Sequence, residues 1–137
     1  MTAPDFTALR LADGVLAPAD ANVVLAEWIA EGASGEEPLY QAPLHRHEED
    51  EAWYVLEGSL CVRIGEQVSE ISAGGAVIVP GGIAHTYWNP APDPARYLLV
   101  MGARTYALIQ AIHAAEDRSP DALRRLFREY GAELLDG

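Results

Sequence analysis

The chain contains no lysine and only one cysteine. All 9 basic residues are arginine, so a lysine Schiff base, a P-loop lysine and a lysine general base are excluded. Because lysine codons are rich in A and T, this usage also suggests a GC-rich bacterial genome. A single cysteine, Cys61, excludes an intrachain disulfide, which fits a reducing compartment. We therefore expect a cytoplasmic protein.

Positive charge is scarce as well. The 9 basic residues are outnumbered by 21 acidic ones, and the formal net charge at pH 7 is −12. A surface of this sign repels nucleic acid and anionic lipid, so we expect no nucleic-acid partner and no membrane partner. No apolar run approaches the roughly 20 residues of a membrane-spanning helix. The opening MTAPDFTALR lacks the basic and apolar segments of a secretory signal.

Short β-like runs occupy most of the chain between residues 23 and 102. They recur about every ten residues between glycine, proline and asparagine turns, which is typical of a sandwich or barrel rather than of βαβ units. The 137 residues suffice for one domain with its own core. We predict an N-terminal arm over 1–20, a β-barrel over 21–103 and C-terminal helices over 104–137.

Two glycines are predicted to begin tight turns inside the barrel. Gly58-Ser59 and Gly65-Glu66 each separate two β-like runs and place glycine first. This order suits the two-residue hairpin turns that require a positive φ at their first position. We predict a hairpin at each.

After Gly102 the apolar period changes from that of a strand to that of a helix. Ser119 is a favourable N-cap and Pro120 suits the first helical position. Apolar residues then follow at helical spacing: Leu123, Leu126, Phe127, Tyr130 and Leu134. We predict two helices packed on the β body or on a partner subunit. His113 lies in the first helix, and we assign it no role.

Histidine and glutamate residues gather around the segment HRHEEDE. In an extended strand, residues i and i+2 point to the same face, so His45 and His47 share a face. Glu51 opens the next β-like run, and His85 follows the turn PGG far downstream. Three imidazoles and one carboxylate can hold Fe(II), Mn(II), Ni(II), Cu(II) or Zn(II) and leave two positions open on an octahedral ion.

The segments around these residues resemble the two sequence motifs of the cupin superfamily. The first motif, HxHxxxExxxxxxG, is matched by HRHEEDEAWYVLEG, with His45, His47, Glu51 and Gly58. The second, GxxxxxPxGxxHxxxN, is matched by GGAVIVPGGIAHTYWN, with Gly74, Pro80, Gly82, His85 and Asn89. The resemblance is strong over about residues 38–102, and the first twenty residues and the helical tail lie outside it.

This resemblance implies an all-β fold, a cupin jelly-roll barrel, to which the C-terminal two-helix extension is added. It also implies one divalent transition metal held by His45, His47, Glu51 and His85. The motif spacing selects Glu51 as the carboxylate ligand. The remaining acids of the segment, Glu48, Glu49 and Asp50, would then be corner residues facing solvent.

The resemblance further implies a metal-dependent enzyme, of quercetin-dioxygenase-like type, acting on a small organic molecule. Trp53 shares a face with Glu51, and Tyr87 shares one with His85, so both are predicted walls of the substrate pocket. Aromatic walls favour an aromatic or polyketide-like substrate over a sugar. Glu51 is the candidate catalytic base for a substrate hydroxyl.

Two other functions fit the same residues. The metal can act only as a Lewis acid, for isomerisation, cyclisation or decarboxylation without O₂. The protein can also be a non-catalytic cupin that binds a metal or small ligand. Consumption of O₂ separates the dioxygenase from these two functions. The resemblance favours a homodimer, formed through β-sheet pairing or through the arm and tail helices.

Overall fold

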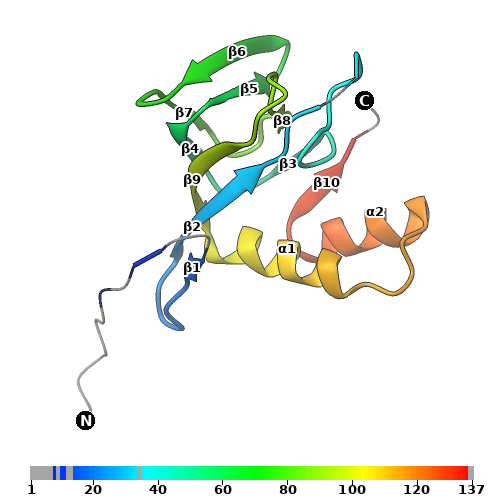
Figure 1. Ribbon diagram of the computed structural model, residues 1–137. Helices are drawn as coiled ribbons and strands as arrows, with labels where there is room; N and C mark the ends of the chain where they lie inside the picture. Colours follow the sequence, from blue (N-terminus) through cyan, green and yellow to red (C-terminus); the bar gives the residue numbers. More distant parts are fainter. Residues whose placement is uncertain (1–7, 9, 12–13, 34, 136–137) are drawn as a thin grey trace.

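The computed structural model describes residues 8, 10–11, 14–33 and 35–135, and two five-stranded antiparallel sheets dominate it (Figure 1). The first sheet consists, in spatial order, of β1 (Val15–Leu16), β2 (Val23–Ala30), β9 (Ala95–Gly102), β4 (Glu51–Glu57) and β7 (Ala76–Val79). The second consists of β10 (Ala132–Leu134), β3 (His45–His47), β8 (His85–Trp88), β5 (Ser59–Ile64) and β6 (Gln67–Ser72). The predicted all-β jelly roll is confirmed.

The predicted N-terminal arm, residues 1–20, lies partly outside the described residues, because 1–7, 9 and 12–13 are not among them. Within the described part, β1 pairs antiparallel with β2, and Val15 is opposite Ala26. This short strand extends the first sheet at its outer edge.

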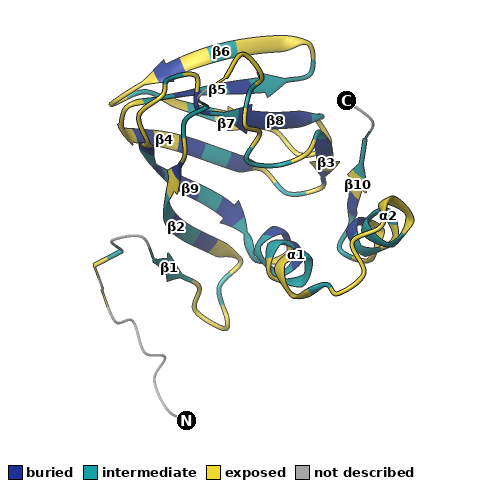
Figure 2. Ribbon diagram, turned by 45° about the vertical axis from the view of Figure 1, so that its right-hand side comes forward, coloured by how far each residue is buried: buried dark blue, intermediate teal, exposed yellow. Residues whose placement is uncertain are grey.

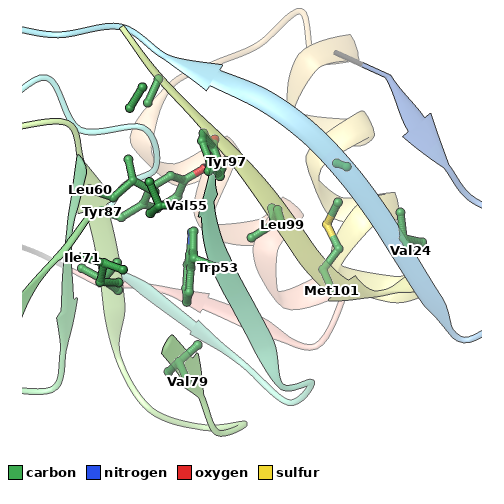
Figure 3. Close-up of a cluster of buried hydrophobic side chains, with 14 residues drawn as sticks. Val24, Trp53, Val55, Leu60, Ile71, Val79, Tyr87, Tyr97, Leu99 and Met101 are labelled. Atoms are coloured by element: carbon green, nitrogen blue, oxygen red, sulfur yellow. The ribbon is translucent and has the colours of Figure 1, made fainter. Parts of the chain in front are cut away.

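The hydrophobic core lies between the two sheets, where alternate residues of each strand point inward (Figure 3). Strand β9 shows the alternation along its whole length, since every second residue is buried. The largest buried apolar side chains include Trp53, Val55, Leu60, Val62, Tyr97, Leu99 and Met101. Burying one such side chain is worth about 1.5–3 kcal/mol. If a strand shifted its pairing by one residue, its apolar side chains would all turn outward. The core therefore holds each strand in register.

Only one of the two predicted hairpins forms. Gly65, with φ of 59°, turns the chain between β5 and β6, and Ile64 is opposite Gln67. The prediction at Gly58 is wrong, because β4 pairs with β7 and β9 whereas β5 pairs with β6 and β8. Gly58 has the expected positive φ of 79° but carries the chain from one sheet to the other. A local pattern can place a turn, but it does not identify the partner strand.

Two helices, α1 (Ala103–Ala114) and α2 (Pro120–Glu129), lie side by side at one end of the barrel (Figures 1 and 2). Leu108 of α1 and Phe127 of α2 are buried in one apolar cluster between them. Ser119 is the N-cap of α2, as predicted, and its side chain accepts a hydrogen bond from the Ala122 N–H at 3.3 Å. Neither helix is long and apolar enough to cross a membrane, judged over the described residues.

The prediction that Leu134 continues the apolar face of α2 is wrong. The helix ends at Glu129, Gly131 adopts a φ of 72°, and Ala132–Leu134 form strand β10. β10 pairs with β3 and places Ala132 opposite His47 and Leu134 opposite His45. An exposed edge of β3 would leave backbone groups unpaired, and the tail satisfies them. The C-terminal segment therefore supports the strand that carries two of the histidines.

Candidate metal centre

Three strands bring the four predicted ligands together. β3 carries His45 and His47 on its inner face, β4 begins with Glu51, and β8 begins with His85. All four side chains are buried, and one potential ligand atom from each lies within 4.8 Å of those of the others. Figure 2 shows β8 as a buried strand of the second sheet. His45 and His85 are direct cross-strand partners, which sets the distance between their imidazoles.

The turn PGG holds the entrance of β8 against the acidic corner that follows β3. The Gly81 N–H donates to the Asp50 carboxylate at 2.7 Å, and the Gly82 N–H donates to the His47 carbonyl, also at 2.7 Å. A Cβ at position 81 would lie 2.0 Å from the Glu48 carbonyl oxygen, so only glycine fits there. This close approach places His85 beside His47, although they are far apart in the sequence.

Each histidine is oriented by a carbonyl two residues away on its own segment. The Nδ1 of His45 lies 2.7 Å from the Pro43 carbonyl oxygen. The corresponding distances are 2.8 Å from His47 to the Glu49 carbonyl and 2.9 Å from His85 to the Ile83 carbonyl. A carbonyl only accepts, so each Nδ1 carries a proton, and in the neutral ring each Nε2 presents a lone pair. The three rings are therefore held in the tautomer that binds a cation through Nε2. A protonated ring can instead donate from Nε2, as His47 and His85 do to the Glu51 carboxylate.

Glu51 supplies negative charge between two of these rings. Its Oε2 lies 3.2 Å from the His47 Nε2 and 3.0 Å from the His85 Nε2. Burial alone would raise the pKa of Glu51, but the hydrogen bonds with His47 and His85 lower it to about 2. Burial opposes charge at His47 too, yet the hydrogen bond and charge of Glu51 raise its pKa. Burial and the charge of His85 lower the pKa of His45 to about 4.

The donor set fits a divalent transition metal. Imidazole nitrogens suit zinc, copper, iron and nickel, and a carboxylate extends the set toward manganese. Without a cation, three imidazoles and an ionised carboxylate are confined together away from water, an arrangement costly in free energy. His45, His47, Glu51 and His85 are therefore the residues that would hold the ion.

A cavity of about 500 Å³ opens beside this cluster, between the barrel and the helices. His45, Glu51, Tyr87 and Tyr97 line it from the strands, and most of its remaining wall is apolar. This volume lies in the range of small-molecule sites. Of the two predicted pocket residues, Tyr87 lines the cavity. Trp53 is 1% exposed and packs behind it, with ring centroids 5.4 Å from Tyr87 and 5.8 Å from His85.

Tyr97 is a site residue that the sequence analysis missed. Its hydroxyl lies 2.7 Å from the Tyr87 hydroxyl, and Figure 3 shows the two side chains meeting in the core. Both side chains also line the cavity. Burial raises the pKa of Tyr97 to about 12 and that of Tyr87 well above its usual range, so both stay protonated at neutral pH. The inward alternation of RYLLVMG could have shown that Tyr97 is buried. Nothing in the sequence around Tyr97 indicates that its hydroxyl contacts that of Tyr87.

The acidic corner is also more structured than predicted. Glu48 is exposed, but Glu49 is half-buried and accepts hydrogen bonds from the backbone N–H and hydroxyl of Thr105. Asp50, although exposed, accepts the Gly81 N–H. The expectation that all three face solvent is therefore wrong for Glu49. Its carboxylate satisfies a backbone N–H in the first turn of α1, where negative charge is favoured.

Comparison with known proteins supports the cupin superfamily. Residues 36–101 match the family model described as "Cupin domain". Among solved structures, a cupin protein from Bacteroides fragilis aligns with a TM-score of 0.57 and 13% identity, covering 74% of this chain and 86% of that one. The polyketide cyclase RemF from Streptomyces resistomycificus aligns with a TM-score of 0.51 and 26% identity, covering 61% of this chain and 56% of that one.

A curated relative is matched over a shorter stretch. Mannose-1-phosphate guanylyltransferase of Salmonella muenchen is 34% identical over 55 residues, which cover 40% of this chain and 11% of the enzyme. The matches span less than half the length of either curated relative found. The comparisons therefore support the fold and the superfamily.

Proposed function

We propose that this protein is a metal-dependent cupin enzyme acting on a small aromatic or polyketide-like molecule, with a dioxygenase-type reaction as the leading possibility. The observation that carries the proposal is the buried set of three oriented imidazoles and one carboxylate at the edge of a largely apolar cavity. A bound divalent metal would supply Lewis-acid stabilisation of a substrate oxygen and open positions for a second reactant.

The protein's own residues have distinct roles in this proposal. Glu51 is ionised at neutral pH and lines the cavity, so it can accept the proton of a substrate hydroxyl. The Tyr87 and Tyr97 hydroxyls stay protonated and share one hydrogen bond, which leaves one O–H of the pair to donate to a substrate oxygen. The apolar wall excludes water and strengthens these polar contacts.

A second candidate is a cyclase or isomerase that uses no O₂. It is favoured by the 26% identity to a polyketide cyclase over 61% of this chain and 56% of that one. The same residues would orient a β-dicarbonyl substrate, and Glu51 would move a proton between its carbons or oxygens. A non-catalytic cupin that only binds the ligand is the remaining alternative.

Oxygen uptake distinguishes these candidates. Metal-loaded protein is mixed with a panel of flavonols, hydroxynaphthoates and 1,3-diketones, and both O₂ and substrate are followed. We expect O₂ consumption matched to substrate loss, abolished in Glu51→Ala. Substrate loss under nitrogen would instead support the cyclase or isomerase. Binding of panel members without conversion, in protein with a full complement of metal, would support the non-catalytic alternative.

We also propose that the outer face of the first sheet joins two copies of the chain. Ala52 pairs with both Ile78 and Val100, and Tyr54 pairs with Leu98, so these side chains form one continuous patch. Ile78 is 65% exposed and Tyr54 is 42% exposed. A contiguous apolar patch on a sheet is typical of a protein interface.

A further inference from the structure

We infer that the ligand of this cavity is an amphipathic organic anion, with its apolar body along α1 and its anionic group bound by Arg118 and His113 at the cavity mouth. The inference rests on the proposed function and names the substrate class of that site. It is carried by residues of the C-terminal helices and of the loop between them.

One face of α1 forms a wall of the cavity. The lining residues of this helix are Thr105, Leu108, Ile109, Ile112 and His113, which recur at i, i+3, i+4, i+7 and i+8. At 1.5 Å per residue, the face from Thr105 to His113 is about 12 Å long. Phe127 of α2 lines the same cavity and packs edge-on against His45, with ring centroids 5.9 Å apart. An apolar surface therefore leads from the metal ligands toward the last turn of α1.

The residues that line the cavity do not share the excess of negative charge of the whole chain. Among the described side chains that line the cavity, Glu51 is the single acidic one, and it is engaged by His47 and His85. Arg118 and His113, in contrast, line the cavity and are exposed. In a chain with a net charge of −12, this opening presents a cationic group to an entering molecule.

Arg118 differs from the arginines that form ion pairs. Arg46 pairs with Glu133 at 2.6 Å, and Arg96 pairs with Glu27 at 3.0 Å. Within the described part of the chain, no carboxylate lies within 4.0 Å of the Arg118 guanidinium. Its charge therefore remains available for an anion.

The contact that Arg118 does make is compatible with ligand binding. One guanidinium nitrogen donates to the Ile112 carbonyl at 2.6 Å, which holds the loop against the last turn of α1. A guanidinium has five N–H donors in a fixed planar fork, suited to a carboxylate. The carbonyl contact positions this fork and leaves donors for a ligand. His113, which lines the cavity from the same turn, offers an additional imidazole N–H.

These features specify three parts of the ligand. A hydroxyl or enol oxygen lies near Glu51, an aromatic or polyketide-like body contacts Leu108, Ile112 and Phe127, and a carboxylate reaches Arg118. A neutral diketone or a sugar would lack either the anionic group or the apolar body. The cavity is therefore selective for hydroxylated aromatic or polyketide-like carboxylates.

The test compares two probes that differ only in the anionic group, 6-hydroxy-2-naphthoate and 2-naphthol. Their affinities are measured by calorimetry and by quenching of Trp28, which lines the cavity, in metal-loaded and in chelated protein. We expect the naphthoate to bind about tenfold more tightly than the naphthol, because a charge-assisted hydrogen bond contributes roughly that factor. In Arg118→Gln this preference should disappear, while the affinity for 2-naphthol stays unchanged.

Two further variants control for structural effects. Arg124→Gln removes an arginine of α2 that pairs with Asp121 and does not line the cavity, so it should keep the full preference. Arg118→Lys retains the charge and should keep much of the preference for the naphthoate. A preference equal in wild type and Arg118→Gln, or failure of both probes to bind, would overturn the inference. Metal content of the same samples tests the proposed function separately, and the Arg118 contrast can still be measured in chelated protein.

Discussion

Glu49 and Thr105 join the corner of the candidate metal site to the helical extension. The Glu49 carboxylate accepts one hydrogen bond from the Thr105 backbone N–H and one from its hydroxyl, each at 2.7 Å. The Glu49 carbonyl accepts the Nδ1–H of His47 at 2.8 Å. One residue therefore orients a candidate metal ligand through its backbone and caps α1 through its side chain.

Glu49→Ala should destabilise the protein by about 1–2 kcal/mol, the usual cost of losing a helix cap. The free energy of unfolding is measured by urea denaturation. Glu49→Gln keeps an acceptor oxygen and should recover part of the loss. Glu48→Ala is the matched control, since Glu48 is exposed and its nearest basic group, on Arg104, is 3.8 Å away. Equal effects of Glu48→Ala and Glu49→Ala would contradict the capping role.

The metal-free protein should lose stability as the pH falls from 6.5 to 4. Burial and the charge of His85 lower the pKa of His45 to about 4, so in this window the unfolded state binds a proton that the folded state does not. The full loss is on the order of 3 kcal/mol at pH 4. The lowered pKa of Glu51, about 2, adds a loss only below about pH 4.5.

The titration of His47 does not cancel this loss of stability at low pH. Its raised folded pKa contributes stability that is fully present below pH 6.5 and is lost only as the pH rises. Urea denaturation between pH 7 and 4.5, in the presence of a chelator, measures the effect. His45→Asn should flatten the dependence in that window. A wild-type stability that is constant or increases toward pH 4.5 would show that His45 is not buried in its neutral form.

The two tyrosine hydroxyls should be energetically coupled. Tyr97→Phe leaves the buried Tyr87 hydroxyl without its partner, at a cost of about 1–3 kcal/mol, and Tyr87→Phe does the same to Tyr97. The double variant should cost less than the sum of the two single variants. Denaturation of all four proteins completes the cycle. Strict additivity would mean that the two hydroxyls do not interact.

The proposed dimer predicts a specific monomerising substitution. Ile78→Asp places a charge in the apolar patch of the first sheet and should convert a dimer to a monomer in analytical ultracentrifugation. Val68→Asp, at a residue 53% exposed on the second sheet, should leave the dimer intact. If wild-type protein sediments as a monomer, or if Val68→Asp dissociates the dimer as readily, the interface lies elsewhere.

The fold and the clustering of the four candidate ligands were predictable because their signals are local and periodic. The HxH spacing puts His45 and His47 on one face of a strand, and this depends only on backbone geometry. The motif supplied the partners Glu51 and His85, which the structure brings together. Alternation in β4 likewise predicted the inward face of Trp53, although not its position behind the cavity wall.

The failures concern contacts between distant segments. Leu134 follows the helical period of α2, but after Gly131 the chain forms a strand that pairs with the edge of β3. Glu49 belongs to a run of acidic residues that is typical of a solvent-exposed turn. Its carboxylate accepts the Thr105 N–H only because α1 folds over it. Neither the Tyr87–Tyr97 hydrogen bond nor the position of Arg118 at the cavity, away from the described carboxylates, could be predicted, because each depends on which elements meet in space.

Metal content tests the central claim most directly. Protein purified without any nickel column is assayed by mass spectrometry, beside His85→Ala and the helix-borne control His113→Ala. We predict near one equivalent of a divalent transition metal per chain in the wild type and in His113→Ala, and sharply less in His85→Ala. Wild-type protein that binds no metal even when supplied with each candidate ion, or metal content unaffected by His85→Ala, would contradict the account.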